Sequence, residues 1–218
     1  MMAIDRKQID AALSMQPTAD QCRAIEKVLS ERRRVARMRA AAAIRAGDDS
    51  PWLVLRVMTG REIAVRDDLK NADIEAIVPM KFGPKLRRFH KEIPPKLQPV
   101  MIGYVLVRCR LIAEALSGLL TFDHVLEVLG GCEKPYRVTA KRVNDFKEKA
   151  EKGEFNHEAT WLSFAGVKRV YIREGVFAGN TGELISGGSK GKGVAVVELT
   201  LFGQATPMIM PLAFLAPL

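Results

Sequence analysis

The sequence has few cysteines, and their spacing does not suit cross-linking or metal binding. Cys22, Cys109 and Cys132 are odd in number and form no CxxC pair. This pattern argues against a disulfide framework or a zinc site, and it fits a reducing cytoplasm. Long apolar runs are missing too: no stretch approaches the roughly 20 apolar residues of a membrane span, and the N-terminus has a polar helical pattern rather than a signal peptide. We therefore expect a cytoplasmic protein with no membrane segment, metal or cofactor.

Residues arranged for catalysis are equally scarce. His90, His124 and His157 stand apart from any Ser, Cys or carboxylate pattern that would indicate a triad or a metal set. The segment 187–193 (GGSKGKG) is rich in glycine, but it lacks the GKS or GKT of a phosphate loop and precedes a predicted strand instead of a helix. We therefore predict a protein that is not an enzyme, and we interpret this segment as a hairpin tip.

Acidic residues are outnumbered by basic ones. The chain of 218 residues has 34 Lys and Arg against 25 Asp and Glu, a formal net charge of +9. A positive surface attracts polyanions, so the charge favours nucleic acid or an acidic protein face as partner. The charge alone is equally compatible with a basic soluble protein whose lysines are merely scattered over its surface.

Residues 1–47 predict a basic helical extension. Helix-forming residues dominate positions 4–46 and are interrupted only around Pro17, so we expect a short helix followed by a longer one. Arginines crowd the second half of the longer helix, and among them Arg33 and Arg37 are candidate nucleic-acid contacts. The alternatives to nucleic-acid binding are that the extension docks on the protein's own first domain or that it is a regulatory tail. Apolar residues recur on one face of this helix, among them Ile25, Val28, Leu29 and Val35.

Residues 51–152 predict a small α+β domain. A Gly-Asp-Ser-Pro loop precedes it, and its elements follow the order β, α, β, β, α, β, α, which is typical of an antiparallel sheet flanked by helices. The run at 103–108 has the strongest strand pattern, so we place it at the centre of the sheet. Thr139 is the expected N-cap of the last helix. The other strands are expected at 52–57, 76–79 and 125–129, and the helices at 61–71, 112–120 and 139–152.

A long irregular stretch separates the second and third of these strands. Prolines at 84, 94, 95 and 99 disfavour a helix, so we predict a mobile loop or hairpin with a basic edge. A solvated loop without a ligand is the alternative. No ordered set of exposed aromatic residues indicates base stacking. The cations of the stretch, against the single acid Glu92, are candidate phosphate contacts: Lys81, Lys85, Arg87, Arg88, Lys91 and Lys96.

A polar linker at 153–163 leads to a second predicted domain at 164–218. Only short strands with glycine turns are expected there, at 167–173, 182–185, 194–201 and 206–211. Short strands separated by closely spaced glycine turns are typical of a small SH3-like β-barrel.

Two groups of motifs carry a family resemblance. The first group resembles a KOW domain. It consists of GVFAGNTG at 175–182, then ELI, a glycine-rich hairpin, the strand 194–201 and FGQATP at 202–207. The second group lies upstream and resembles the N-terminal domain of NusG. It consists of WLV at 52–54, GRE at 60–62, VP at 78–79, GYVLV at 103–107 and the two glycines at 130–131. The similarity covers residues 51–218 in the family's domain order. The chain thus resembles NusG-like transcription elongation and antitermination factors, with the helical extension left uncovered.

This resemblance implies binding to RNA polymerase. In NusG-like proteins a concave apolar patch of the first domain grips the clamp helices of the largest polymerase subunit. The matching positions here are Trp52, Met101, Ile102 and Tyr104, and Met101 stands where the family usually has an aromatic residue. The basic stretch matches a loop that lies near the upstream duplex and the non-template DNA strand.

The resemblance also implies a partner for the second domain, such as the termination factor Rho or a small-subunit ribosomal protein. Phe177, Leu201 and Phe202 match the contact positions, whereas Asn180 replaces a usual phenylalanine and Gln204 a usual arginine. These changes predict a weaker contact and a specialised paralogue. The apolar end at 208–215 leaves three alternatives open: packing on the first domain, packing on a partner, or a last strand with an apolar tail.

Two other functions compete with this one. A ribosome- or RNA-binding KOW protein would act through its basic surface and bind isolated RNA in a salt-dependent way. An enzyme acting on nucleic acid would need a clustered acidic or metal site, which the sequence does not display.

Overall fold

The computed structural model describes residues 18–44, 51–83, 86–88, 91–156, 164, 166–187 and 193–218. The chain forms two compact units, Met1–Arg37 and Met38–Leu218, and each is described by itself. The predicted short helix before Pro17 lies outside the described residues, as does the centre of the predicted hairpin tip at 188–192.

The longer helix of the extension is present as α2 (Ala19–Ala43). A capping box begins it: the backbone N–H of Thr18 donates to Gln21 Oε1 at 2.9 Å, and that of Gln21 donates to Thr18 Oγ1 at 3.4 Å. Arg33 and Arg37 are exposed in the first unit. So is an apolar stripe on the same helix, made of Ile25, Val28 and Leu29.

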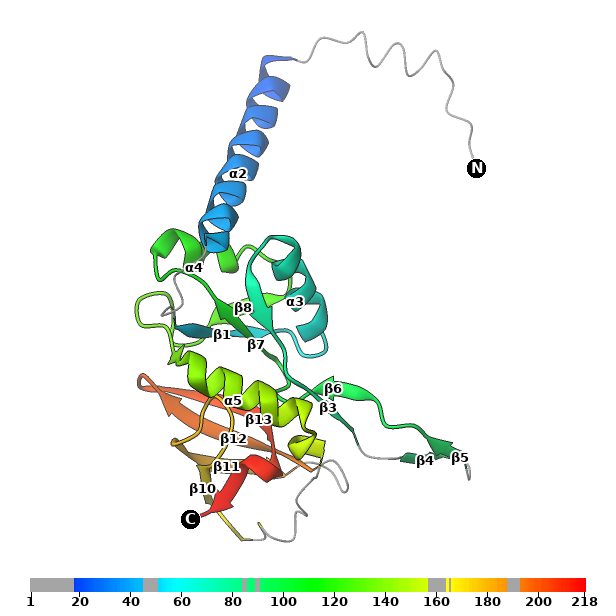
Figure 1. The fold of residues 1–218 in the computed structure, drawn as a ribbon. Helices are drawn as coiled ribbons and strands as arrows, with labels where there is room; N and C mark the ends of the chain where they lie inside the picture. Colours follow the sequence, from blue (N-terminus) through cyan, green and yellow to red (C-terminus); the bar gives the residue numbers. More distant parts are fainter. Residues whose placement is uncertain are drawn as a thin grey trace. The chain divides into compact units, whose positions relative to one another are not determined.

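The second unit begins with the predicted α+β domain (Figure 1). Its main sheet is antiparallel and has the order β2-β7-β1-β8, with β9 paired to the other half of β1. The strand at 104–108 is central, as predicted, while the two-residue β9 was missed. The strands are β1 (Trp52–Val57), β2 (Glu75–Ile77), β7 (Tyr104–Arg108), β8 (Val125–Val128) and β9 (Arg137–Val138).

Both faces of this sheet are buried, which explains the continuous apolar runs of its central strands. Alternate residues point to opposite faces. One face belongs to what we call the first core, which includes Leu53, Leu55, Val105 and Val107 together with residues of α3 (Glu62–Asn71) and α4 (Ala113–Leu119). The other face belongs to the shared core, which includes Trp52, Val54, Tyr104 and Leu106 together with residues of α5 (Ala140–Glu151) and of the C-terminal strands.

Two capping and turn contacts hold these elements in place. Thr139 caps α5 as predicted, with its Oγ1 accepting the backbone N–H of Arg142 at 3.4 Å. The buried carboxylate of Glu62 accepts the backbone N–H of Gly103 at 2.7 Å, where the chain turns into β7 with a glycine φ of 83°. The GRE and GYVLV motifs are therefore in direct contact, and Glu62 has a structural role.

The last turns of α2 pack on the first domain. Met38, Ala41 and Ala42 are buried, and a Cβ on Gly118 of α4 would collide with the backbone carbonyl of Met38. The Arg39 guanidinium lies 4.3 Å from the centre of the Phe122 ring, and it donates to the hydroxyl and the carbonyl of Thr121 at 2.9 and 2.6 Å. Docking on the first domain, one of three alternatives for the extension, is therefore observed for residues 38–43.

The stretch predicted as a loop or hairpin consists of two short antiparallel ribbons. Prolines 94 and 95 lie between the strands, Pro99 pairs with Met80 at the base, and Pro84 lies outside the described residues. The hairpin was therefore predicted correctly in kind, although it is more regular than expected. The first ribbon pairs β3 (Met80–Phe82) with β6 (Leu97–Pro99), and the second pairs β4 (Leu86–Arg88) with β5 (Lys91–Ile93).

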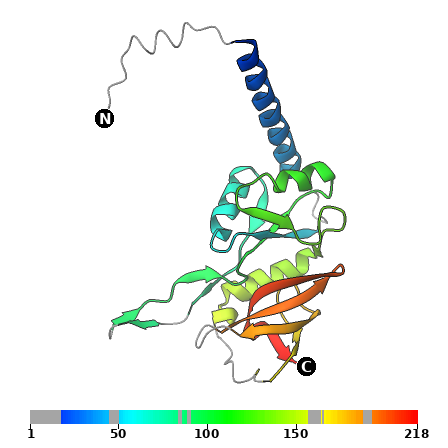
Figure 2. The same ribbon diagram turned by 180° about the vertical axis from the view of Figure 1, so that it is seen from behind.

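The C-terminal residues form a five-stranded antiparallel sheet in the order β13-β12-β11-β10-β14, which fits the predicted SH3-like barrel. In both ribbon views α5 lies between this sheet and the first one (Figure 1, Figure 2). The last strand and the short 3₁₀ turn η3 (Leu212–Phe214) before it were missed, because the sequence ends in a uniformly apolar run. The strands are β10 (Arg169–Ile172), β11 (Thr181–Gly187), β12 (Val194–Leu201), β13 (Gln204–Pro211) and β14 (Leu215–Pro217).

Candidate functional site

The residues expected to bind polymerase lie on the face of the first sheet that the barrel covers. Trp52, Met101 and Tyr104 are buried in the shared core, and Ile102 is half-buried beside them. The resemblance assigns this patch to RNA polymerase. In this structure residues of the second domain cover the patch and complete the core on this face.

Tyr104 and Ile102 contact the barrel directly. The rings of Tyr104 and Phe177 meet edge to face, with centroids 6.0 Å apart and planes at 75°. Such aromatic pairs contribute about 0.5–1.5 kcal/mol beyond the area they bury. Ile102 forms an isolated antiparallel bridge with Ile209 of β13, so backbone pairing reinforces the contact between the side chains. We call this interface between the first domain and the barrel the domain seam.

The residues expected to recruit a partner lie at the same seam. Phe177 and Leu201 are buried, and Phe202 is largely exposed but reaches the Tyr136 ring at a centroid distance of 6.4 Å. Phe177 also packs on Tyr136, at 5.3 Å. The two surfaces that the sequence assigned to two different partners therefore cover each other.

Tyr136 is a residue of the site that sequence reasoning missed. Its hydroxyl donates to the carbonyl of Val176 at 3.2 Å and accepts the Asn180 side-chain amide at 3.3 Å. That amide also donates to the carbonyl of Phe177 at 2.8 Å. Asn180 was noted only as a departure from the family's usual phenylalanine, and here it ties the barrel loop to the first domain. Nothing in the sequence distinguishes Tyr136 from any other partly buried aromatic residue.

The apolar C-terminal end closes the far side of the seam. Phe214 of η3 packs on Phe146 of α5 and on Phe155, with centroid distances of 5.8 and 4.9 Å. Phe155 belongs to η1 (Glu154–Asn156), a 3₁₀ turn at the start of the predicted linker. Of the three alternatives for this end, packing on the first domain is the one observed. The same end of the chain also contributes to the last strand of the barrel.

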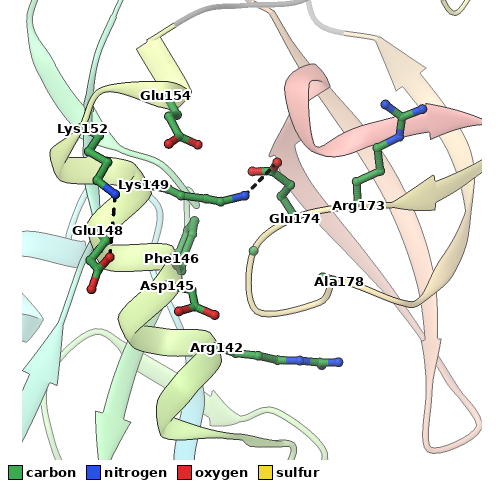
Figure 3. A pocket seen from close by; sticks show the side chains of 11 residues that line it. Arg142, Asp145, Phe146, Glu148, Lys149, Lys152, Glu154, Arg173, Glu174 and Ala178 are labelled. Carbon is green, nitrogen blue, oxygen red and sulfur yellow. Dashed lines mark ion pairs between the residues drawn. The ribbon is translucent and has the colours of Figure 1, made fainter.

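Charged residues surround the seam where α5 faces the loop at 173–178 (Figure 3). Lys149 Nζ lies 3.0 Å from a carboxylate oxygen of Glu174, and this ion pair crosses a cavity of about 330 Å³. The balance of charge around the cavity gives no attraction for a ligand of either sign. The lining has four cations and four anions, namely Arg142, Lys149, Lys152 and Arg173 against Asp145, Glu148, Glu154 and Glu174.

Burial also changes the acidity of Tyr104. Loss of solvent raises the pKa of its phenol to about 12, with smaller opposing effects from Arg56, which lowers it, and Glu127, which raises it. Arg56 and Glu127 pair with each other at 3.1 Å. The phenol therefore stays neutral at physiological pH, and its ionisation opposes the closed seam.

The predicted nucleic-acid contacts occupy two separate places. Arg33 and Arg37 are exposed on α2 in the first unit, and Lys96 is exposed next to β6 in the second. Strands β4 and β5 contain Arg87, Arg88 and Lys91, while Lys85 lies outside the described residues.

Lys81 requires a correction. Its side chain is only 1% exposed, because alternation along β3 turns it to the packed side of the ribbon while Phe82 faces solvent. We therefore remove Lys81 from the set of phosphate contacts.

Comparison with known proteins supports the family signatures. Residues 50–147 match the family model described as transcription termination factor nusG. Comparison with curated proteins gives no match. A solved structure described as domain interaction in Thermotoga maritima NusG is 18% identical over 81% of this chain and 99% of that chain, with a TM-score of 0.39. Conformations A and B of the MjSpt4:Spt5 complex are 14% and 17% identical over 77% of this chain and 97% and 96% of those chains, with a TM-score of 0.25 for each.

A metal-ligand cluster and a membrane-spanning helix are both absent from the part of the chain that the structure describes. There, no three His, Cys, Asp or Glu side chains gather as metal ligands. Among the same residues, no helix combines the length and apolarity needed to cross a membrane. Proteins of the NusG family are non-enzymatic transcription factors. The match over residues 50–147, which contain most of the α+β domain, supports a NusG-like family member with a function of the transcription elongation factor kind.

Proposed function

We propose that this chain is an elongation or antitermination factor that binds RNA polymerase through Trp52, Met101, Ile102 and Tyr104. The barrel would recruit a second partner through Phe177, Leu201 and Phe202. The observation that carries the proposal is that Tyr104 and Phe177, one from each surface, are buried against each other across the domain seam. Large aromatic and branched side chains on both sides are what protein interfaces use as anchors.

The same observation adds a condition for binding. Tyr104 and Phe177 contact each other, so neither can contact a separate protein until the seam opens. The apparent affinity for polymerase then falls in proportion to the fraction of open molecules. We propose the clamp helices of the largest subunit as the polymerase contact, and Rho or a small-subunit ribosomal protein as the partner of the freed barrel.

The basic residues supply a third contact in this proposal. Arg33 and Arg37 on α2, and Lys96 with the cations of β4 and β5, would bind phosphates of the upstream duplex or the non-template strand. Neutralising phosphates releases counterions, so this part of the binding should weaken as the salt concentration rises.

Two tyrosines allow a direct test, because both touch Phe177 but only one belongs to the patch. Tyr136→Ala should open the seam and increase the amount of RNA polymerase retained by the full chain. Tyr104→Ala should decrease it, since the patch loses an anchor. Polymerase pull-down measures the effect, with circular dichroism to show that both variants remain folded. A change of the same sign in both folded variants would show that the patch is assigned wrongly.

An RNA-binding protein of the ribosome is the second candidate, and the exposed arginines of α2 favour it. In that case Tyr136→Ala should not affect binding, whereas Arg33→Glu with Arg37→Glu should abolish salt-sensitive binding to isolated RNA.

A further inference from the structure

The part of α2 that lies in the first unit exposes aliphatic side chains along one side. Every residue from 18 to 34 is exposed, and among them Ile25, Val28 and Leu29 are 51%, 51% and 43% exposed. Helical residues three or four positions apart lie on the same face, so these side chains form one surface. Large apolar groups on one face of an otherwise polar helix are normally covered by another element. No described part of this chain covers them.

This surface has the spacing of a coiled coil. Ile25, Val28, Arg32 and Val35 follow one another at alternating intervals of three and four residues, and Leu29 lies beside them. From Ile25 to Val35 the helix rises by about 15 Å. Side chains with this spacing form the surface that a single partner helix covers. We call these five residues the α2 seam.

Arg32 places a positive charge within the α2 seam. The residue is exposed and has no ion-pair partner among the described residues, whereas Arg34 Nη1 lies 3.9 Å from Glu31 Oε2. A polar residue at one such position selects the partner and its register, and a carboxylate opposite a guanidinium makes a charge-assisted hydrogen bond. A matching helix therefore carries Asp or Glu at one position of an otherwise apolar stripe.

The surrounding charge indicates which kind of helix fits. Residues 19–37 contain six Lys and Arg against three Asp and Glu, a net charge of +3. A parallel second copy of α2 would bring Arg32 against Arg32, and in either direction two helices of charge +3 repel each other. A phosphate backbone would pair with the arginines, but it offers no apolar surface to Ile25, Val28 and Leu29. An acidic helix with an apolar stripe matches both the charge and the aliphatic side chains.

We propose that the α2 seam binds an acidic amphipathic helix of another protein, with a carboxylate of that helix facing Arg32. This contact is additional to the proposed polymerase and nucleic-acid contacts, and it gives the N-terminal extension a protein-binding role. Arg33 and Arg37 lie outside the seam, at the b and f positions of the same heptad repeat, so their proposed phosphate contacts do not compete with the helix. A seam this short buries a small area, so the binding is weak and reversible.

The test uses a synthetic peptide with the chemistry of the proposed partner, which we call the stripe peptide. It is about three heptads long, with Leu at the a and d positions, Glu at e and g, and one Glu in place of the central a-position Leu. Repulsion between the Glu side chains disfavours pairing of the peptide with itself. A scrambled peptide of the same composition has the same charge but no apolar stripe. Fluorescence anisotropy of the labelled peptides gives their dissociation constants for the full chain.

Two sets of variants in the full chain separate the apolar part of the seam from its charge. Ile25→Gln with Val28→Gln removes two apolar side chains and introduces good helix formers, and Ser30→Gln on another face of α2 is the control. Arg32→Glu reverses the charge within the seam, and Arg34→Glu makes the same change outside it. Circular dichroism shows whether the helix content of each variant equals that of the parent protein.

The parent protein should bind the stripe peptide at least about tenfold more tightly than the scrambled peptide. Ile25→Gln with Val28→Gln should weaken binding of the stripe peptide about tenfold or more, because apolar contact area is lost. Arg32→Glu should weaken it at least about fivefold more than Arg34→Glu, since the new carboxylate faces the central Glu of the peptide. Ser30→Gln should bind like the parent protein.

Several results would overturn the inference. One is that the parent protein does not bind the stripe peptide, and another is that it binds both peptides equally, which would reduce the contact to charge alone. Equal effects of Arg32→Glu and Arg34→Glu would refute the carboxylate opposite Arg32.

Two further results would assign the seam to a different occupant and refute the acidic helix. In the first, the parent protein sediments as a dimer and Ile25→Gln with Val28→Gln as a monomer, so that a second copy covers the seam. In the second, the same double variant loses binding to a labelled oligothymidine while Ser30→Gln keeps it, so that the seam belongs to a nucleic-acid surface.

Discussion

The two faces of the first sheet are both buried, but by different parts of the chain. The first core is closed by α3 and α4, which follow their strands directly in the sequence. The shared core is closed by α5 and by a barrel that follows it in the chain. The first core therefore belongs to the folding of one domain, whereas the shared core is built from surfaces that the family resemblance assigns to other proteins. Burial alone thus does not distinguish a folding core from a covered binding surface, and the following changes should separate the two.

The largest effect should come from truncation in the first core. Leu55→Ala removes a fully buried side chain and should lower the free energy of unfolding by about 2–5 kcal/mol. Leu126→Ala, at a 55% exposed position of β8, is the control and should change it by about 0.5 kcal/mol or less. Thermal unfolding followed by circular dichroism measures both. If Leu55→Ala left the midpoint unchanged, the first core would not be the basis of the fold.

A smaller loss should follow from adding one methyl group where α2 meets α4. In Gly118→Ala the new Cβ collides with the Met38 carbonyl, so the end of α2 must move, at a cost of about 1–3 kcal/mol. Hydrogen exchange of the amides at 38–43 should become faster. Ser117→Ala on the same helix is the control. Unchanged exchange in Gly118→Ala would mean that α2 does not pack here.

Alkaline pH should weaken the shared core through Tyr104. Its pKa is about 12 in the folded protein and about 10 in the unfolded one, so below pH 10 the phenol is neutral in both and its contribution is complete. Between pH 10 and 12 the unfolded state loses its proton first, and stability falls. Burial raises the pKa of the Cys109 thiol to about 11, which acts in the same direction in the first core.

Tyr104→Phe isolates the phenol from the thiol. Urea unfolding at pH 9 and at pH 11 should show a smaller loss of stability for this variant than for the parent protein. An equal loss in both would assign the alkaline effect to other groups.

The smallest effect should come from the ion pair across the seam. Lys149 and Glu174 are 39% and 34% exposed, so their contribution is about 0.2–1 kcal/mol after screening. Lys149→Glu and Glu174→Lys should each increase polymerase binding modestly, and the double swap should return it to the parent level. If the double swap bound like the single variants, the ion pair would not help to hold the seam closed.

Features set by local patterns were predictable from the sequence, and those set by distant contacts were not. The runs at 52–57 and 194–201 and the Thr139 cap depend on neighbouring residues, and all were found where expected. The capping box at Thr18 was present in the sequence as the pattern TADQ and was overlooked.

Tyr104 and Phe177 are far apart in the chain but in contact in the structure. The periodicity of apolar residues in the sequence does not predict such a contact. The motifs identified the members of both surfaces but not the fact that they meet. Lys81 was misassigned for a related reason: in a stretch rich in proline the alternation of a three-residue strand is too short to recognise. Which cation faces inward is then decided by packing of the ribbon.

The central claim is that the seam must open before polymerase binds, and a reversible cross-link tests it most directly. Ile102 and Ile209 are bridge partners, so cysteines at both positions would lie within reach of a disulfide. Cys22 and Cys132 are exposed and would be replaced by serine. We predict that the oxidised protein does not retain RNA polymerase and that reduction of the same sample restores binding. Equal polymerase binding by the oxidised and reduced forms would contradict the account.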